Sequence, residues 1–243
     1  MCGAGGDTDV KMRDCMIHTL FEDKYLVVCE KPVGVLSAPE AGKRRNMPDL
    51  LKKQTRAWRI DIIHRLDQPV GGVMVYSKSS KATPNLYKQM ASHRFTKEYL
   101  AVVTGVPAAP AGEWTDWLLK DTARCKSRVV RAGTAGAKEA ILRYRVLATV
   151  QKDGVPLTLV KVRLFTGRTH QIRVQFSSRR TPLLGDDKYG GSGGENFRGL
   201  GLWSYRLAFR HPVTGTPLDH VCPPPRQYPW TLFDTAVFDT PIE

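Results

Sequence analysis

The sequence is poor in cysteine, and its cysteines lack any spacing typical of a functional site. The five of them are scattered, and no two form a CxxC pair. An odd, scattered set argues against a disulfide framework and for a reducing compartment, so we expect the protein to act in the cytoplasm. The five cysteines are Cys2, Cys15, Cys29, Cys125 and Cys222.

Long apolar runs are also absent. No run approaches the roughly 20 apolar residues that a helix needs to cross a bilayer. The first residues carry acids early and have no apolar signal core, so residues 1–16 are expected to be a short disordered lead and not a secretion signal. We expect the remainder, residues 17–243, to be one domain with no membrane partner.

The common signatures of nucleotide and metal chemistry are missing as well. There is no P-loop and no HExxH motif, and the six histidines are scattered. His220 and Cys222 form the only close pair of potential soft metal ligands. If the protein is an enzyme, we therefore expect it to use no metal and no cofactor.

What the sequence has in excess is positive charge. Its 37 lysines and arginines against 23 acids give a formal net charge of +14. The surplus is concentrated between Lys43 and Arg65, and a second patch lies at Arg124–Arg131. A solvated surface explains any single lysine, but the whole excess favours a nucleic-acid partner.

The hydrophobic patterning predicts an α+β fold. Residues 139–150 and 157–165 alternate apolar and basic side chains, which is typical of antiparallel strands with one wet face. Strands outnumber helices and do not alternate with them regularly. Further strands are expected at 24–29, 72–78 and 96–105, and a late strand with a turn at 200–215. Helices are expected after Asn46, within 81–95 and from near Thr169.

One acidic residue in this basic chain deserves a functional hypothesis. Asp67 lies in "IHRLDQPVGG", where a turn would be the default explanation for an aspartate before Gln-Pro. Three other segments accompany it in order along the chain: "KPVG", "FTKEYLAVVTG", and "TGRTHQIRVQF" followed by "PLLGDDKYG".

This ordered set resembles the motifs of RluA-type pseudouridine synthases across residues 24–210. The resemblance implies a mixed, mostly antiparallel sheet with flanking helices and a basic central cleft, and typically a monomer. Two positions depart from the pattern: Val70-Gly71-Gly72 replaces the usual Thr-Ser-Gly, and Gln175 replaces a histidine. The N-terminal S4-like domain of many members is not expected here, because the motifs begin by residue 31.

The resemblance assigns the catalytic roles to three residues. Asp67 would be the essential carboxylate, by attacking C1′ of the uridine, attacking C6 of the base, or abstracting a ribose proton. Arg173 would pair with Asp67 and keep it charged, although a surface arginine is the ordinary interpretation. Tyr99 would stack on the flipped uracil, although a strand tyrosine is by default a core residue.

Five further residues are expected to bind the substrate. Arg65 would help to hold the target base out of its stack, and Leu184 would complete an apolar wall, a role that core packing explains equally well. His64 flanks the carboxylate, where a structural histidine is favoured over a proton shuttle. Arg168 and His170 would contact phosphate or shape the third motif.

The function implied is an isomerase that converts uridine to pseudouridine in structured RNA, either ribosomal or transfer RNA. The alternative is an RNA-binding or RNA-folding factor whose catalysis is lost or incidental, but a carboxylate in a basic groove would repel phosphate there. A hydrolase is a weaker hypothesis, because no paired carboxylates are identifiable. Substrate specificity is expected from the segments 106–136 and 190–199.

Overall fold

The structure is a computed structural model that describes residues 16–42, 45–191, 193 and 197–242. The predicted lead therefore lies outside the described residues except for Met16. Lys43 and Arg44 of the basic segment, and residues 192 and 194–196 of the segment 190–199, lie outside them too. None of the described helices is long and apolar enough to cross a membrane.

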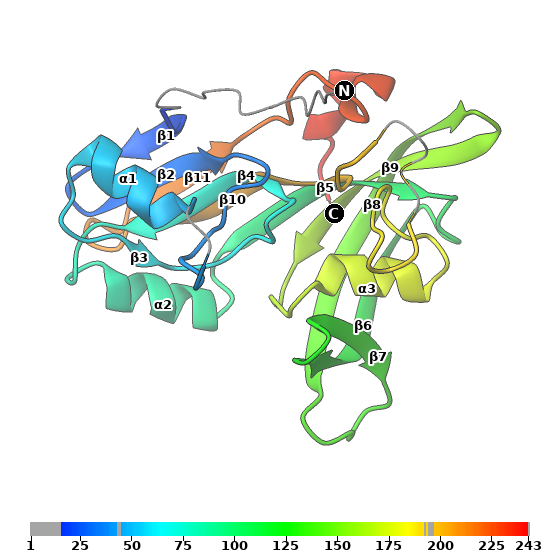
Figure 1. The fold of residues 1–243 in the computed structure, drawn as a ribbon, viewed down its shortest axis with the longest axis horizontal. Coiled ribbons are helices and arrows are strands. Elements are labelled where there is room, and N and C mark those ends of the chain that lie inside the picture. The colour runs from blue at the N-terminus through cyan, green and yellow to red at the C-terminus, as the bar shows by residue number, and fades with distance from the viewer. Residues whose placement is uncertain (1–15, 43–44, 192, 194–196, 243) are drawn as a thin grey trace, which may run out of the picture.

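One large, strongly curved sheet organises the chain (Figure 1). Its strands follow the order β1-β2-β4-β10-β5-β9-β8-β6-β7, with β11 added to β10 and β3 added to β4. Among the described strands, only β4 and β10 pair in parallel, which confirms the predicted mixed and mostly antiparallel sheet. The strands are β1 (Thr19–Glu22), β2 (Leu26–Lys31), β3 (Asp61–Ile62), β4 (Gly71–Ser77), β5 (Thr96–Thr104), β6 (Ala111–Asp121), β7 (Lys126–Val130), β8 (Lys138–Lys152), β9 (Val155–Leu164), β10 (Leu202–Arg210) and β11 (Pro217–Val221).

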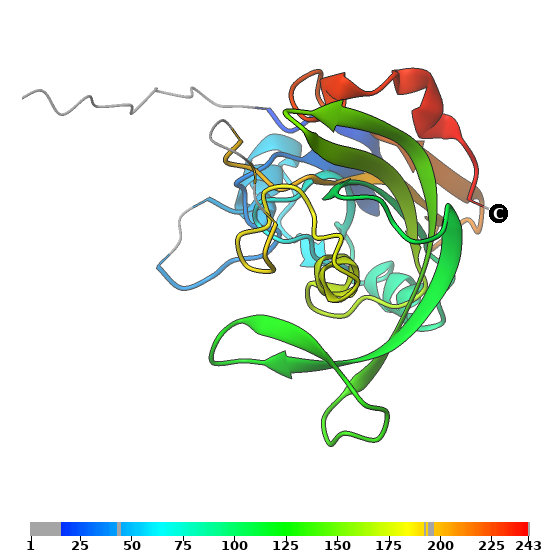
Figure 2. The same ribbon diagram turned by 90° about the vertical axis from the view of Figure 1, so that its right-hand side faces the viewer.

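Short helices cover both faces of the sheet and confirm the α+β class. They are α1 (Met47–Thr55), α2 (Thr83–Ala91) and α3 (Gln171–Ser178), with two short 3-10 helices, η1 (Trp230–Leu232) and η2 (Thr235–Asp239). The side chain of Asn46 caps α1 by accepting a 3.0 Å hydrogen bond from the amide of Asp49, as its position predicted. Figure 2 shows α3 end-on, inside the curve formed by β6, β8 and β9.

The sheet separates two apolar cores, because successive side chains of a strand point to opposite faces. On β5, Tyr99 and Ala101 belong to the core under α1 and α3. Leu100 and Val102 belong to the other core, which α2, η1 and η2 cover. The strand thus presents Tyr99 to the same side of the sheet as α3.

Two local expectations were wrong. The third helix begins at Gln171 and not near Thr169, because His170 is in the left-handed conformation with φ 56°. The segment 106–136, in which no strand was expected, contains the long hairpin β6–β7, which extends from the sheet (Figure 1). Almost every residue of β6 is exposed or half-buried, so its sequence lacks the apolar alternation that marks a strand.

Gly71 and Gly72 allow the close approach of β4 and β10. A Cβ on Gly71 would lie 2.3 Å from the Trp203 ring, and one on Gly72 would lie 2.1 Å from the backbone oxygen of Ser204. Gly72 also has φ +113°, a conformation that residues with a side chain rarely adopt. These glycines therefore set the parallel contact at which the Asp67 segment enters the sheet.

Gly72→Ala is expected to lower the free energy of unfolding by about 3 kcal/mol or more, because backbone strain and a backbone clash add together. Gly154→Ala is the matched control, since Gly154 has φ +76° but open space around its Cβ position, and should cost about 1 kcal/mol. Urea denaturation of both variants measures the difference. Equal losses would show that the approach of β4 and β10 is not limited by Gly72.

Candidate active site

Most of the residues assigned from the motifs meet in one cleft of about 1120 Å³. Most of its lining comes from the loop after β2, the segment leading into β4, the start of β5, and the segment from the end of β9 into α3. The end of α2, the hairpin β6–β7, Lys188 and Leu202 complete it. The predicted site residues in its lining are His64, Arg65, Asp67, Tyr99, Arg168, His170 and Arg173. Leu184 is absent from the lining.

Asp67 occupies a turn that the "KPVG" loop braces. The amide of Val70 donates a 3.0 Å hydrogen bond to the Asp67 carbonyl and closes the turn. The next carbonyl, that of Gln68, accepts from the amide of Gly34 at 2.9 Å and from Lys31 Nζ at 3.2 Å. The side chain of Asp67 remains 30% exposed and faces the cleft, so a substrate can reach it.

Lys31 is a buried cation that holds two loops together. Its Nζ also donates to the carbonyls of Pro32 at 2.9 Å and Val35 at 2.6 Å. Burial lowers the pKa of Lys31 to about 8, while the negative charge of Asp67 acts in the opposite direction. Lys31 therefore links the "KPVG" loop to the turn that carries Asp67.

Arg173 on α3 joins two carboxylates. Its Nη1 donates a 2.9 Å hydrogen bond to Asp67 Oδ2. Its Nε and Nη2 donate to the two oxygens of Asp186 at 2.8 and 2.7 Å, a bidentate pairing. Asp186 is 1% exposed and Arg173 is 7% exposed, so this half of the network is shielded from water.

The network keeps Arg173 charged and leaves its position fixed. Burial opposes the positive charge, but the hydrogen bonds and charges of Asp186 and then Asp67 outweigh it and raise the pKa of Arg173. A guanidinium can satisfy both carboxylates at once because its donors lie in a rigid plane. Asp186 therefore fixes the guanidinium, and the guanidinium fixes the carboxylate of Asp67.

His170 is a second neighbour of Asp67. Its Nε2 lies 3.5 Å from Asp67 Oδ2, and its Nδ1 lies 2.9 Å from the hydroxyl of Tyr189. The Tyr189 hydroxyl in turn accepts from the amide of Ser127 on β7 at 2.7 Å. Burial lowers the pKa of His170, which favours the neutral ring. The hairpin β6–β7 thus reaches the Asp67 neighbourhood through Tyr189.

Tyr99 forms part of the cleft wall and is 6% exposed. Burial, and secondarily the charge of Asp67, raises the pKa of its hydroxyl, so the phenol stays protonated. The side chain of its β10 partner, Ser204, lies beside it and donates to the Val73 carbonyl at 2.9 Å. Leu164, Ile172 and Leu202 are among the apolar residues of the lining.

The other basic residues of the cleft differ in their exposure and partners. The Arg65 side chain is 66% exposed and lies 3.6 Å from Glu40. The Nε of Arg168 donates to the Glu139 carbonyl at 2.7 Å. His64 accepts from the Val75 amide at 3.2 Å, and burial together with Lys97 lowers its pKa to about 3. The ring of His64 is therefore neutral and supports the backbone of β4.

Leu184 lies on the far side of the sheet. It is buried in the core that contains Leu100 and Val102, whereas Tyr99 faces the opposite core. Leu184 joins β5 through its amide, which donates to the Val102 carbonyl at 2.8 Å. In this structure its side chain is a core residue and does not face the cleft.

Sequence reasoning missed Asp186. It belongs to the quoted "GDDKYG" segment, but two adjacent aspartates carry no signal that separates a buried partner from a surface residue. The structure separates them, because Asp186 is buried against Arg173 and Asp187 is exposed. Gln175, the departure from the expected histidine, is fully buried and donates to Asp116 on β6 at 2.7 Å, so it helps to hold α3 on the sheet.

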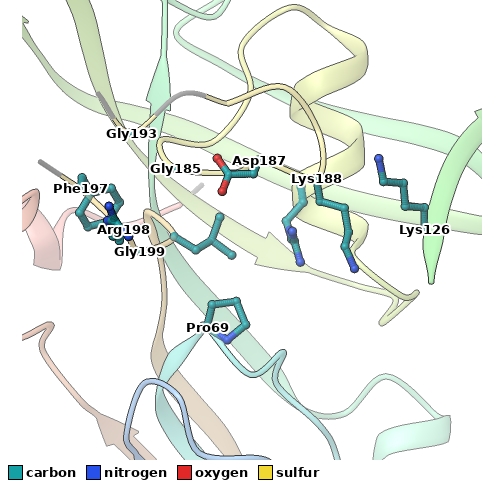
Figure 3. A pocket seen from close by; sticks show the side chains of 11 residues that line it. Pro69, Lys126, Gly185, Asp187, Lys188, Gly193, Phe197, Arg198 and Gly199 are labelled. Carbon is teal, nitrogen blue, oxygen red and sulfur yellow. The ribbon is translucent and has the colours of Figure 1, made fainter. Parts of the chain in front are cut away.

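A second hollow of about 830 Å³ adjoins the cleft and shares with it Pro69, Arg173 and Lys188. Figure 3 shows Phe197 and Arg198 on one side of this hollow and Lys126 and Lys188 on the other, with Asp187 between them. Cations thus lie on both sides of this second hollow. Among the described residues, no three His, Cys, Asp or Glu side chains are grouped so that they could hold a metal ion.

Comparisons with known proteins agree with this arrangement. Residues 25–178 match the RNA pseudouridylate synthase family. The chain is 33% identical over 240 residues to ribosomal large subunit pseudouridine synthase D of Xylella fastidiosa, covering 90% of this chain and 69% of the relative. It is 34% identical over 224 residues to an uncharacterized RNA pseudouridine synthase of Aquifex aeolicus, covering 85% of this chain and 69% of the relative.

A solved structure of human RNA pseudouridylate synthase domain containing 4 has a similar fold. The two superpose with a TM-score of 0.70 at 26% identity, covering 88% of this chain and 91% of the human chain. The family match, the two bacterial relatives and the fold confirm the resemblance that the motifs indicated. The chain belongs to the RNA pseudouridylate synthase family, the isomerases that convert uridine in RNA to pseudouridine.

Proposed function

We propose that Asp67 is the essential carboxylate and that the target uridine enters the cleft from its exposed side. The observation that carries the proposal is the hydrogen-bonded chain from Asp186 through Arg173 to Asp67. A protein that only binds RNA gains nothing from an ionised carboxylate that is held in its basic groove, since the carboxylate repels phosphate. An enzyme that acts at C1′ or C6 of uridine requires one.

The reaction needs Asp67 to be charged and correctly oriented. Breaking the C1′–N1 bond and rejoining the base through C5 begins with Asp67 acting on the sugar or the base, and each of the three routes uses the ionised form. Arg173 stabilises that form and selects one orientation, while the neutral His170 stands beside it. Catalysis gains from this arrangement because the carboxylate pays little to reorganise during the reaction.

The remaining cleft residues suit the binding of a flipped nucleotide. Tyr99 offers a flat, protonated ring against which uracil can stack. Arg65 is exposed at the rim, where its guanidinium can replace the base in the RNA stack. Arg168 and His170 frame the sugar and phosphate. Leu184 contributes to the core behind this site, and His64 to the backbone that carries it.

The substrate we propose is RNA of the large ribosomal subunit. The bacterial relative at 33% identity is a ribosomal large subunit pseudouridine synthase, and its similarity covers 90% of this chain. Transfer RNA is the alternative that the experiment below also samples. We further propose that the enzyme acts as a monomer in the cytoplasm without a cofactor; the free thiols of Cys29, Cys125 and Cys222 agree with a reducing compartment.

Asp67→Asn is expected to lower pseudouridine formation by at least about a thousandfold, because the amide cannot act as a nucleophile or base. The measurement is carbodiimide labelling and reverse transcription of total RNA from cells that lack the gene, incubated with purified protein. Wild type should create a reverse-transcription stop in large-subunit RNA, and Asp67→Asn should not.

Asp153→Asn serves as a matched control, since the Asp153 side chain is 81% exposed and lies away from the cleft on the β8–β9 turn. A reverse-transcription stop in transfer RNA only would show that the substrate is transfer RNA and not large-subunit ribosomal RNA. Binding of RNA by wild type without any new stop would favour the RNA-binding function, and a stop made equally well by Asp67→Asn would remove Asp67 from catalysis.

Asp186→Asn is expected to lower the free energy of unfolding by about 3 kcal/mol, because it leaves the buried Arg173 with a weakened partner. Asp187→Asn changes the adjacent, exposed residue and should alter the free energy of unfolding by less than about 0.5 kcal/mol. Urea denaturation compares the two variants. Equal effects would mean that the Asp186 ion pair does not stabilise the fold.

A further inference from the structure

Lys97 is a cation of the cleft that neither the motifs nor the comparisons assign a role. It lies near the start of β5, two residues before Tyr99, so both side chains point to the same face of the sheet. It lines the same cleft as Asp67 and Tyr99. Its ammonium group makes no hydrogen bond or ion pair with the residues that the structure describes.

The surroundings of Lys97 are basic. Its Nζ lies 3.7 Å from the position that a Cβ on Gly167 would occupy, which places it against the loop that carries Arg168. Besides burial, the charge of Arg168 lowers the pKa of Lys97, and the charge of Lys97 in turn lowers the pKa of the buried His64 ring. His93, at the turn between α2 and β5, also lines the cleft.

A half-buried cation without a counterion is costly, because burial removes water that the protein does not replace. Burial and the charge of Arg168 lower the pKa of Lys97 to about 8, the direction that this cost predicts. An anion bound next to Lys97 in the cleft would offset this cost of burial. Asp67 does not serve, since it is already engaged by Arg173 and makes no ion pair with Lys97 among the described residues.

We propose that Lys97 and Arg168 form a binding site for a backbone phosphate that flanks the target uridine. The site rests on the proposed function, because it presumes that a uridine stacks on Tyr99. Two residues of a strand span about 7 Å, a separation that one nucleotide bridges between its base and a neighbouring phosphate. A uracil on Tyr99 with its C1′ at Asp67 then directs that phosphate toward Lys97.

The test uses a short RNA stem-loop with the target uridine, and versions in which one phosphate, on either the 5′ or the 3′ side, is an uncharged methylphosphonate. Single-turnover rates against protein concentration are measured for wild type and Lys97→Met. The variant is expected to raise the half-saturating concentration about 10- to 100-fold. The maximum rate should be nearly unchanged, and Lys97→Arg should restore most of the affinity. Lys88→Met, an exposed lysine of α2 outside the cleft, should behave as wild type.

The methylphosphonate distinguishes a phosphate contact from a structural role. At one of the two positions, the methylphosphonate should weaken RNA binding by wild type by about the same factor as Lys97→Met does. At that position it should not weaken binding by Lys97→Met any further. Independent, multiplying losses at both positions would overturn the proposal, as would a variant that loses only maximum rate. Fluorescence anisotropy with the same RNAs measures the affinities without turnover. If wild type bound these RNAs but made no pseudouridine, the proposed function would fail, while the phosphate contact could still be tested by binding.

The pH dependence of binding provides a second readout. Free Lys97 loses its proton as the pH rises through about 8, whereas a bound phosphate favours the protonated form. Wild-type affinity should therefore fall above pH 8 more steeply than that of Lys97→Arg. Lys31, His64, His93 and Arg168 are present in both proteins, so they do not produce a difference between the two profiles. Identical profiles for wild type and Lys97→Arg would contradict the proposal.

Discussion

The arrangement of the site depends on one shared guanidinium. Arg173 gives two of its donors to a carboxylate that water does not reach, Asp186, and a third to one that faces the cleft, Asp67. The buried pair fixes the plane of the guanidinium, and the plane determines where the exposed carboxylate lies. A lysine could not replace it, because a point charge on a flexible stem does not define such a plane.

The rest of the fold holds Arg173 and the turn with Asp67 in fixed positions relative to each other. Helix α3, which carries Arg173, is tied to β6 by Gln175 and by Arg179, both of which donate to Asp116. The turn with Asp67 is tied to the "KPVG" loop by Lys31 and enters the sheet where Gly72 lets β4 approach β10. Asp67 and Arg173, 106 residues apart in sequence, meet because both supports are rigid.

Much of this could be predicted from the sequence. Alternation marked β8 and β9, Asn46 marked the start of α1, and the ordered motifs indicated the family and the residues that line the cleft. The rest depends on long-range contacts that leave no local pattern. Asp186 differs from Asp187 only in burial, and Leu184 was placed at the wall although its side chain packs in the opposite core. The hairpin β6–β7 was missed because its exposed first strand lacks alternation.

The central claim is that Asp186 acts on Asp67 only through Arg173. A double-mutant cycle tests it directly, with maximum single-turnover rates of pseudouridine formation for Arg173→Met, Asp186→Asn and the double variant under conditions where all three remain folded. The account predicts that the double variant is no slower than Arg173→Met alone, since without the guanidinium Asp186 has nothing to position. Losses that multiply would contradict it, because the two residues would then contribute to the reaction independently.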